Sequence, residues 1–162
     1  MDVVILIGSE SDLEIAAEAR RILEEFGVSH RVEVSSAHRS PERTRALIAE
    51  SEKQGAKIFI AVAGKAAHLA GFLAGHTTLP VIGVPVESGG LGGMDALLST
   101  VQMPKGVPVA TMGLGKAGAS NAAVLAVQIL SLADPDLHKK LREHKRKLAE
   151  QVENSSRSIR KS

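Results

Sequence analysis

Residues 3–27 read VVILIGSESDLEIAAEARRILEEFG, and this stretch decides the fold class. Val3 to Ile7 is an unbroken apolar, β-branched run that ends at Gly8, which is typical of a strand buried on both faces. From Leu13 to Phe26 apolar residues recur at helical spacing, and Gly27 follows as a stop signal. The stretch therefore predicts a buried strand, a short loop and an amphipathic helix.

The same alternation continues along the chain. Ser40 and Pro41 are a cap and a first helical residue, and they open a predicted helix that ends at Gln54. Alternating strands and helices predict an α/β fold with a parallel central sheet, in which ligands bind beyond the carboxyl ends of the strands. The further predicted strands cover residues 31–34, 57–63, 81–84 and 107–112, and the further predicted helices cover residues 66–74 and 121–133.

Composition excludes several classes of protein. The chain has 162 residues, of which 44% are hydrophobic, as expected for one globular domain with a single core. It contains no cysteine, which excludes disulfides, thiolate metal sites and a cysteine nucleophile. No apolar run reaches the roughly 18 residues of a membrane span, and the N-terminus lacks the pattern of a signal peptide. We expect a cytoplasmic protein that does not interact with membranes.

The basic character of the chain is confined to its C-terminal end. Residues 131–162 carry nine Lys or Arg and five Asp or Glu, whereas residues 1–130 carry eleven and thirteen. Aromatic residues make up only 2%, too few for the stacking platforms of many nucleic-acid-binding proteins. We expect one catalytic α/β domain over residues 1–137, a basic C-terminal helix or tail over 138–162, and no nucleic-acid partner. Contact of the tail with nucleic acid is the weaker alternative.

Two loops carry the first candidate site residues. Ser9, Ser11 and Asp12 follow the first strand, where hydroxyls and backbone N–H groups at a helix start form either an anion site or a plain capped turn. In the loop after the second strand, Ser36 and Arg39 are suited to clamp a phosphate. His38 lies between them and is placed for proton transfer near neutral pH.

A third loop, Ala63-Gly-Lys-Ala-Ala-His68, follows the third strand. Its small residues let a ligand approach the backbone closely, and His68 is a second histidine after a sheet strand. The glycine-rich stretch 87–95 is either a flexible loop or a lid, and we expect the patternless segment 99–108 to be an ordered functional loop. We assign no metal, because His38 and His68 lack acidic companions at ligand spacing. We assign no role to the other histidines, which are His30, His76, His138 and His144.

Seven motifs in order, between about residues 3 and 137, give the chain a specific resemblance to the N5-carboxyaminoimidazole ribonucleotide mutases of purine synthesis. They are Gly8-Ser-Glu-Ser-Asp12, Ser36-Ala-His-Arg39 with Pro41, Ala66-Ala-His-Leu69, Pro80-Val-Ile-Gly-Val-Pro85, Asp95-Ala-Leu-Leu-Ser99, Val101-Gln-Met-Pro104 and Gly118-Ala-Ser-Asn121.

The resemblance implies a flavodoxin-like three-layer α/β/α sandwich that assembles into homo-octamers with active sites at subunit contacts. It implies a ribonucleotide substrate and no ATP, biotin or metal, so no cofactor. In this family a carboxylate moves from the exocyclic nitrogen of an aminoimidazole ribonucleotide to ring carbon C4, by way of released and recaptured carbon dioxide. His38 would be the general acid/base.

Further roles come from the resemblance, residue by residue. The ribose phosphate would be held by Ser9, Ser11, Asp12, Ser36 and Arg39. The pocket around the carboxylate would be lined by Ala63, Gly64, Ala66, His68 and Leu69, and His68 is a second candidate catalytic residue. The candidate substrate-binding set also includes Ala37 and Lys65.

Two positions depart from the family pattern. Lys65 stands where the mutases have glycine, and Ala70 stands where they have proline. A basic residue at position 65 is similar to the related carboxylases, which take carbon dioxide directly, whereas Arg39 and His68 are mutase-like. A carboxylase and a non-catalytic nucleotide-binding paralogue therefore remain the alternatives to the mutase.

Overall fold

A five-stranded, all-parallel sheet forms the centre of the protein. The structure is a computed structural model, and it describes residues 1–160. The strands are β1 (Val3–Ile7), β2 (His30–Val34), β3 (Ile58–Gly64), β4 (Val81–Val86) and β5 (Ala110–Thr111), in the spatial order β2-β1-β3-β4-β5. The predicted α/β class and parallel sheet are confirmed.

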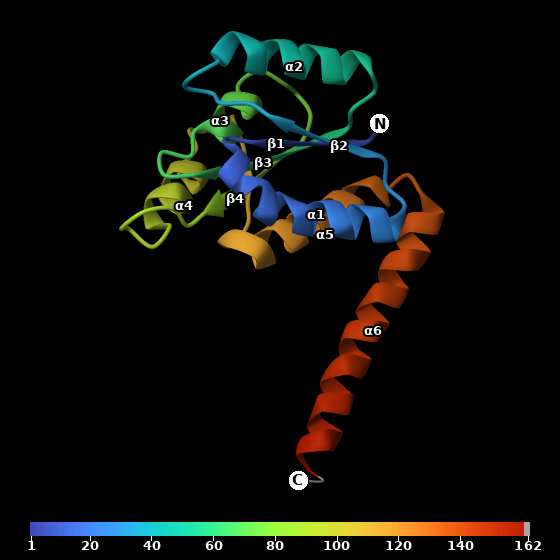
Figure 1. Cartoon of the computed structure of the whole chain (residues 1–162). Coiled ribbons are helices and arrows are strands. Elements are labelled where there is room, and N and C mark those ends of the chain that lie inside the picture. The colour runs from blue at the N-terminus through green and yellow to red at the C-terminus, as the bar shows by residue number, and fades with distance from the viewer. Residues whose placement is uncertain (161–162) are drawn as a thin grey trace. The chain divides into compact units, whose positions relative to one another are not determined.

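Helices cover both faces of this sheet (Figure 1). One face is covered by α1 (Leu13–Phe26), which follows the short 3-10 turn Glu10–Asp12, and by the part of α5 (Gly115–Leu130) up to Ala126. The opposite face is covered by α2 (Pro41–Lys53), α3 (Leu69–Ala74) and α4 (Met94–Val101). The result is the three-layer α/β/α sandwich that the resemblance implied.

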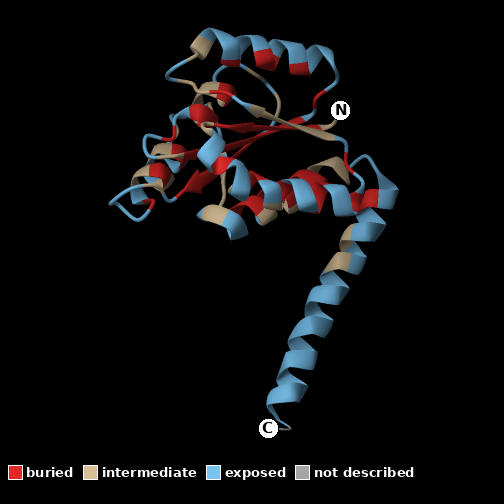
Figure 2. Cartoon of the chain, viewed as in Figure 1, coloured by how far each residue is buried: buried red, intermediate tan, exposed pale blue. Residues whose placement is uncertain are grey.

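The centre of the sheet is buried on both faces. Every residue of β1 and β4, and all of β3 up to Ala63, is buried, whereas β2 at the edge is only partly buried (Figure 2). Alternate side chains point to opposite faces, so Val4 and Leu6 pack with α2 and α3 while their neighbours face the other layer. This explains why β1, β3 and β4 read as continuous apolar runs.

The structure differs from the sequence prediction at α3 and at α4. The third helix was predicted from residue 66, but α3 begins only at Leu69, because residues 65–68 form a turn that starts with a left-handed residue. Residues 94–95 and 99–101 lay in segments predicted as loops and residues 96–98 had no predicted element, yet residues 94–101 together form α4. The glycines just before α4 masked a helical pattern in which Ala96 and Thr100 face the core.

The bounds of β5 and α5 also differ from the prediction. The fifth strand was predicted over 107–112, but only Ala110 and Thr111 pair with β4. Pro108 lacks the N–H that a longer ladder needs. The last helix of the sandwich was predicted over 121–133, whereas α5 spans Gly115–Leu130. Gly118 is needed there, because a Cβ would lie 1.7 Å from the carbonyl oxygen of Gly113.

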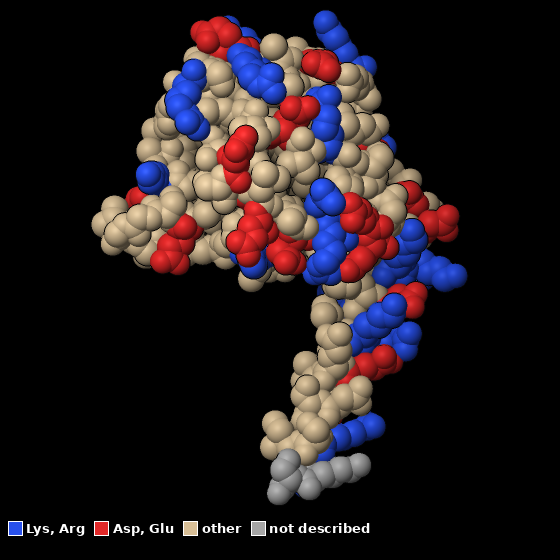
Figure 3. Space-filling view, viewed as in Figure 1, with Lys and Arg blue, Asp and Glu red and all other residues tan. Residues whose placement is uncertain are grey.

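The chain divides into two compact units, Met1–Ala126 and Val127–Ser162. The second unit contains α6 (Pro135–Ile159), whose N-terminus is capped by the Asp134 carboxylate. Charged side chains gather along one side of α6 (Figure 3). Most of the predicted basic C-terminal helix or tail is thus helical, and its residues 161–162 lie outside the described residues. The proposed division into 1–137 and 138–162 stays a prediction.

No helix within residues 1–160 is both long and apolar enough to cross a membrane.

Gly83 in β4 provides a test of this packing. A Cβ there would lie 2.4 Å from Cγ2 of the buried Thr100 on α4 and 3.0 Å from Cγ1 of Val109, which precedes β5. The substitution Gly83→Ala therefore forces these two side chains to move. We expect a loss of about 1–3 kcal/mol of unfolding free energy, measured by urea denaturation. Gly90→Ala, in open space, is the matched control and should change stability little. Equal stability of the two variants would contradict this packing.

Candidate active site

A cavity of about 550 Å³ lies at the carboxyl ends of the strands. Its volume suits a ligand the size of a nucleotide. All thirteen candidate residues from the sequence line it, together with two that sequence reasoning left out, Gly8 and Ser88. The thirteen are Ser9, Ser11, Asp12, Ser36, Ala37, His38, Arg39, Ala63, Gly64, Lys65, Ala66, His68 and Leu69.

Parallel pairing brings these residues together. β1 pairs with both β2 and β3, and the last residue of β1, Ile7, is in register with Val34 and Val62. The loops after these three strands therefore begin at the same edge of the sheet, although they are about 30 residues apart in sequence. Ser88 enters from the loop after β4, which is the next strand in the sheet.

The loop after β1 presents hydroxyls and a buried carboxyl group. The Ser9 hydroxyl accepts from the backbone N–H of Ser11 at 3.3 Å and from the Ser11 hydroxyl at 3.0 Å. Ser9 therefore caps the 3-10 turn, whereas the Asp12 side chain makes no capping bond at the start of α1. Asp12 is only 5% exposed, and this burial raises the pKa of its carboxyl group, against the opposing effect of hydrogen bonds from Ser11 and Ser9.

The loop after β2 holds the arginine. The Arg39 guanidinium donates to the Gly8 carbonyl at 3.1 Å and to the Ser36 hydroxyl at 3.4 Å, so it links the loops after β1 and β2. At the start of the same loop, the buried Ser35 hydroxyl forms a hydrogen bond of 2.7 Å with the hydroxyl of Thr44 on α2. The hydroxyl of Ser40 bonds back to the carbonyl of Ser36 and does not cap α2 as we expected. These contacts fix the loop that carries His38.

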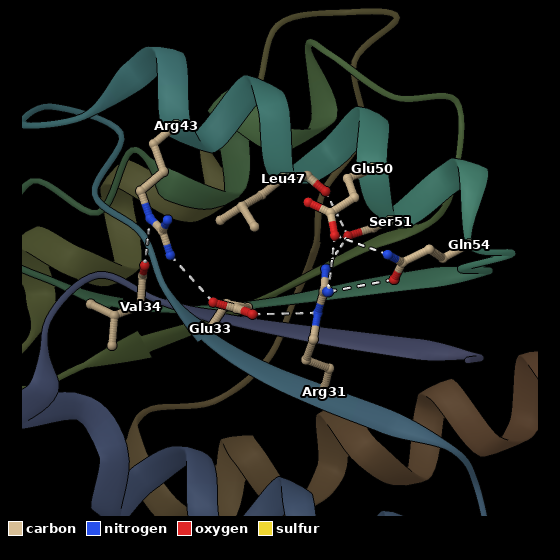
Figure 4. A network of polar contacts seen from close by, with 8 residues as sticks. All are labelled: Arg31, Glu33, Val34, Arg43, Leu47, Glu50, Ser51 and Gln54. Carbon is tan, nitrogen blue, oxygen red and sulfur yellow. Dashed lines mark hydrogen bonds and ion pairs between the residues drawn. The ribbon is translucent and has the colours of Figure 1, made fainter.

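A polar network fastens α2 to the edge strand β2 (Figure 4). Glu33 on β2 lies 3.6 Å from Nε of Arg31 and 3.3 Å from the guanidinium of Arg43 on α2. Arg31 also reaches Glu50 at 3.6 Å and donates to the Ser51 hydroxyl at 3.0 Å. Exposed pairs contribute little alone, but Arg31 is half-buried and joins several partners. The network holds in place the helix that follows the His38 loop.

The two candidate histidines are in direct contact. Nε2 of His38 lies 2.6 Å from Nδ1 of His68, and the rings meet edge to face with centroids 4.7 Å apart. Both side chains are exposed, and both line the cavity. A hydrogen bond between two imidazoles needs one N–H and one lone pair, so the two rings share a single proton in this contact. The pair joins the loops after β2 and β3.

The loop after β3 makes a tight turn. A Cβ on Gly64 would lie 2.2 Å from Oγ of Ser88, so only glycine lets the two loops approach this closely. The next residue, Lys65, has a φ of 55° and is the one non-glycine residue with positive φ within residues 1–160. A lysine in this left-handed region costs on the order of 1 kcal/mol relative to glycine.

The charges that line the cavity are two cations, Arg39 and Lys65, and one carboxyl group, that of Asp12. This balance favours an anionic ligand. The described part of the chain contains no group of three or more His, Cys, Asp or Glu side chains placed to hold a metal ion. Of the other histidines, His30 and His76 bond to the backbone carbonyls of Val28 and Phe72, away from the cavity.

Comparison with known proteins identifies the family. The model of the AIR carboxylase family matches residues 2–151. The chain is 52% identical over 152 residues to the N5-carboxyaminoimidazole ribonucleotide mutase of Bacillus subtilis, covering 94% of each chain. It is 47% identical to the mutase of Escherichia coli, covering 93% of this chain and 89% of that protein. The chain belongs to the AIR carboxylase family.

A solved structure agrees with this result. The crystal structure of Treponema denticola PurE superposes with a TM-score of 0.87 at 30% identity, covering 96% of each chain. The flavodoxin-like sandwich implied by the resemblance is therefore shown both by the strand order and by this likeness.

The buried Asp12 gives a prediction about pH. Its folded-state pKa lies above the ordinary value of 3.8, so the ionised carboxylate costs stability at neutral pH, and this cost disappears as the pH falls below the unfolded value. Asp12→Asn should therefore melt at a higher temperature than the parent at pH 7, and the gap should close towards about pH 4. Thermal unfolding across this range tests it. The exposed neighbour Glu10→Gln is the control, and a pH-independent gap would contradict the burial argument.

Proposed function

We propose that this member of the AIR carboxylase family is an N5-carboxyaminoimidazole ribonucleotide mutase, which moves the carboxylate of its substrate from the exocyclic nitrogen to ring carbon C4. The observation that carries the proposal is the hydrogen-bonded pair of His38 and His68, set in a nucleotide-sized cavity between hydroxyl-rich loops. The curated relatives are mutases at 47–52% identity over most of the chain, which supports the same reaction.

The loops after β1 and β2 bind the ribose phosphate in this proposal. The hydroxyls of Ser9, Ser11 and Ser36 and the guanidinium of Arg39 are hydrogen-bond donors that suit phosphate oxygens. Arg39 is already held by Ser36 and by the Gly8 carbonyl, so little side-chain freedom is lost when the phosphate binds. Asp12 lies at the same end and suits the ribose hydroxyls as an acceptor.

The reaction then needs one proton to be moved. When the N–C bond breaks and carbon dioxide leaves, the exocyclic nitrogen gains a proton. When C4 attacks carbon dioxide and the new C–C bond forms, C4 loses a proton. The two transfers cancel, so a single acid/base that gives one proton and takes one back completes the cycle. We assign this role to His38, which lines the cavity and is hydrogen-bonded to a second base.

His68 acts with His38 in this proposal. The 2.6 Å contact fixes the orientation of the His38 ring and determines which of its nitrogens carries the proton. Ala63, Ala66 and Leu69 belong to the end of β3, the loop after it and the start of α3. They present small or apolar surface to the cavity, which suits neutral carbon dioxide between its release and recapture. Orientation and retention are the contributions that such a transfer needs from a protein.

We further propose that the chain acts in the cytoplasm, without a cofactor, as a homo-octamer with active sites at subunit contacts. The number eight rests on the resemblance alone. An independent observation supports assembly with further copies of the chain. Met94, Leu98 and Val101 are exposed at spacings of four and three residues, so they form one apolar stripe on α4, and Leu91 is exposed in the loop before it.

The central test of the reaction is His38→Asn. Asparagine keeps a polar side chain of similar size but cannot shuttle the proton, so kcat should fall by about 10²–10⁴-fold while the ribonucleotide still binds. Turnover is followed by the absorbance of the C4-carboxylated product, and binding by calorimetry. His76→Asn is the matched control, because His76 stacks on Phe72 outside the cavity. Unchanged turnover of His38→Asn would exclude His38 as the acid/base.

The choice of carboxyl donor separates the mutase from its alternatives. The parent protein is given either the N-carboxylated ribonucleotide or aminoimidazole ribonucleotide with bicarbonate, in both cases without ATP. We expect fast product formation from the first only. Efficient use of the second at low bicarbonate would identify a carboxylase, the alternative raised by the basic residue at position 65. No product from either would identify a nucleotide-binding paralogue.

The assembly is tested on the α4 stripe. Leu98 is 49% exposed, so Leu98→Glu should fold normally but place a charge in the proposed contact and shift the native mass from eight copies to smaller species. Native mass spectrometry measures the shift, with Lys53→Glu on α2 as the control for added negative charge. A parent protein that is monomeric at micromolar concentration would disprove the assembly.

A further inference from the structure

Lys65 combines an unfavourable backbone with a position in the cavity wall. Its φ of 55° lies in the left-handed region, where glycine carries no penalty, and both of its neighbours, Gly64 and Ala66, also line the cavity. Gly64 has a structural reason to be glycine, which is the approach of Ser88. No packing requirement explains a long cationic side chain at the following position, because Lys65 is exposed. Strained residues of this kind cluster at functional sites.

The ammonium group of Lys65 makes no hydrogen bond or ion pair with any side chain in residues 1–160. The other cavity cation differs in this respect, since the Arg39 guanidinium bonds to both Ser36 and Gly8. Lys65 is therefore the cation that stays available for a ligand. The surrounding charges on the cavity wall are few, with Asp12 as the one acidic lining residue.

The two cations lie on different loops. Arg39 follows β2 and reaches across to the loop after β1, where the serine hydroxyls gather. Lys65 follows β3 and is three residues before His68, whose ring contacts His38. β1 lies between β2 and β3 in the sheet, so the two loops start from opposite sides of β1. The Arg39 guanidinium is thus tied to the loop of the serine hydroxyls, whereas Lys65 shares its loop with His68.

We propose that Lys65 is a specificity-determining residue that binds the migrating carboxylate and so selects carboxylated ribonucleotides over the decarboxylated one. The inference rests on the proposed function, in which phosphate occupies the Arg39 end and the reacting carboxyl group lies beside the histidines. Substrate and product both carry a carboxylate there, whereas the intermediate aminoimidazole ribonucleotide does not. A cation at this end therefore strengthens binding of the first two alone.

Three substitutions separate charge from backbone strain. Lys65→Gly removes the charge and relieves the left-handed residue. Lys65→Asn removes the charge but keeps a side chain that tolerates this backbone region. Lys65→Arg keeps the charge and serves as the rescue. Lys105→Gly, outside the cavity lining, is the control for loss of one lysine elsewhere.

The experiment measures the affinity of each purified protein for two ribonucleotides by calorimetry, one with the C4 carboxylate and one without it. For Lys65→Gly and Lys65→Asn we expect about tenfold weaker binding of the carboxylated ligand and less than twofold change for the other, as for one ion pair. Lys65→Arg should stay within about threefold of the parent for both ligands. KM for the N-carboxylated substrate should rise more than kcat falls.

The outcomes separate this inference from the proposed function. Equal weakening of both ligands would mean that Lys65 acts on the phosphate, and unchanged binding of both would mean that its side chain only points to solvent; either result overturns the inference. In the second case Lys65→Gly should still raise the melting temperature by a few degrees, because it relieves the backbone. A parent protein that binds neither ribonucleotide would instead overturn the proposed function itself.

Discussion

Burial of β1 on both faces is the constraint on which the rest of the structure depends. All five of its residues are completely buried, and it pairs on both sides, with β2 and with β3. Because the pairing is parallel, the chain must leave all three strands at the same edge of the sheet. The loops that follow them therefore meet without any contact of their own having to bring them together. The position of the site therefore follows from the parallel strand register, and the side chains of the loops determine only its chemistry.

Loops brought to one edge still need to be fixed in shape. The loop after β2 is held by the buried Ser35–Thr44 contact and by the ionic network that ties α2 to β2 (Figure 4). The loop after β3 is held by the close approach of Gly64 and Ser88. His38 and His68 project from these two supported loops, so their 2.6 Å contact joins segments that each have stabilising contacts of their own. Preorganisation of this kind reduces what substrate binding must supply.

The sequence was sufficient where one physical signal dominated. Buried runs marked β1, β3 and β4. The hydroxyls, the arginine and the two histidines that follow β1, β2 and β3 marked residues that the structure places around one cavity. It was insufficient where signals conflicted. Glycines hid α4 and the first turns of α5, and a proline shortened β5. Ser88 was missed because its role depends on how closely it approaches Gly64, a distance between loops that local sequence does not encode.

The two ends of the cavity differ in chemistry, and this difference orients a ligand. The end formed after β1 and β2 offers serine hydroxyls and a guanidinium, which can donate hydrogen bonds to phosphate oxygens in place of water. The end formed after β3 offers alanine and leucine surface, an ammonium and His68, whose ring contacts His38 from the loop after β2. A carboxylate can form an ion pair with the Lys65 ammonium. Neutral carbon dioxide forms no ion pair, and it suits the apolar surface of the alanine and leucine side chains. The same few residues can therefore hold the carboxyl group in both of its forms while the phosphate end stays fixed, which is the requirement of a transfer between two atoms of one substrate.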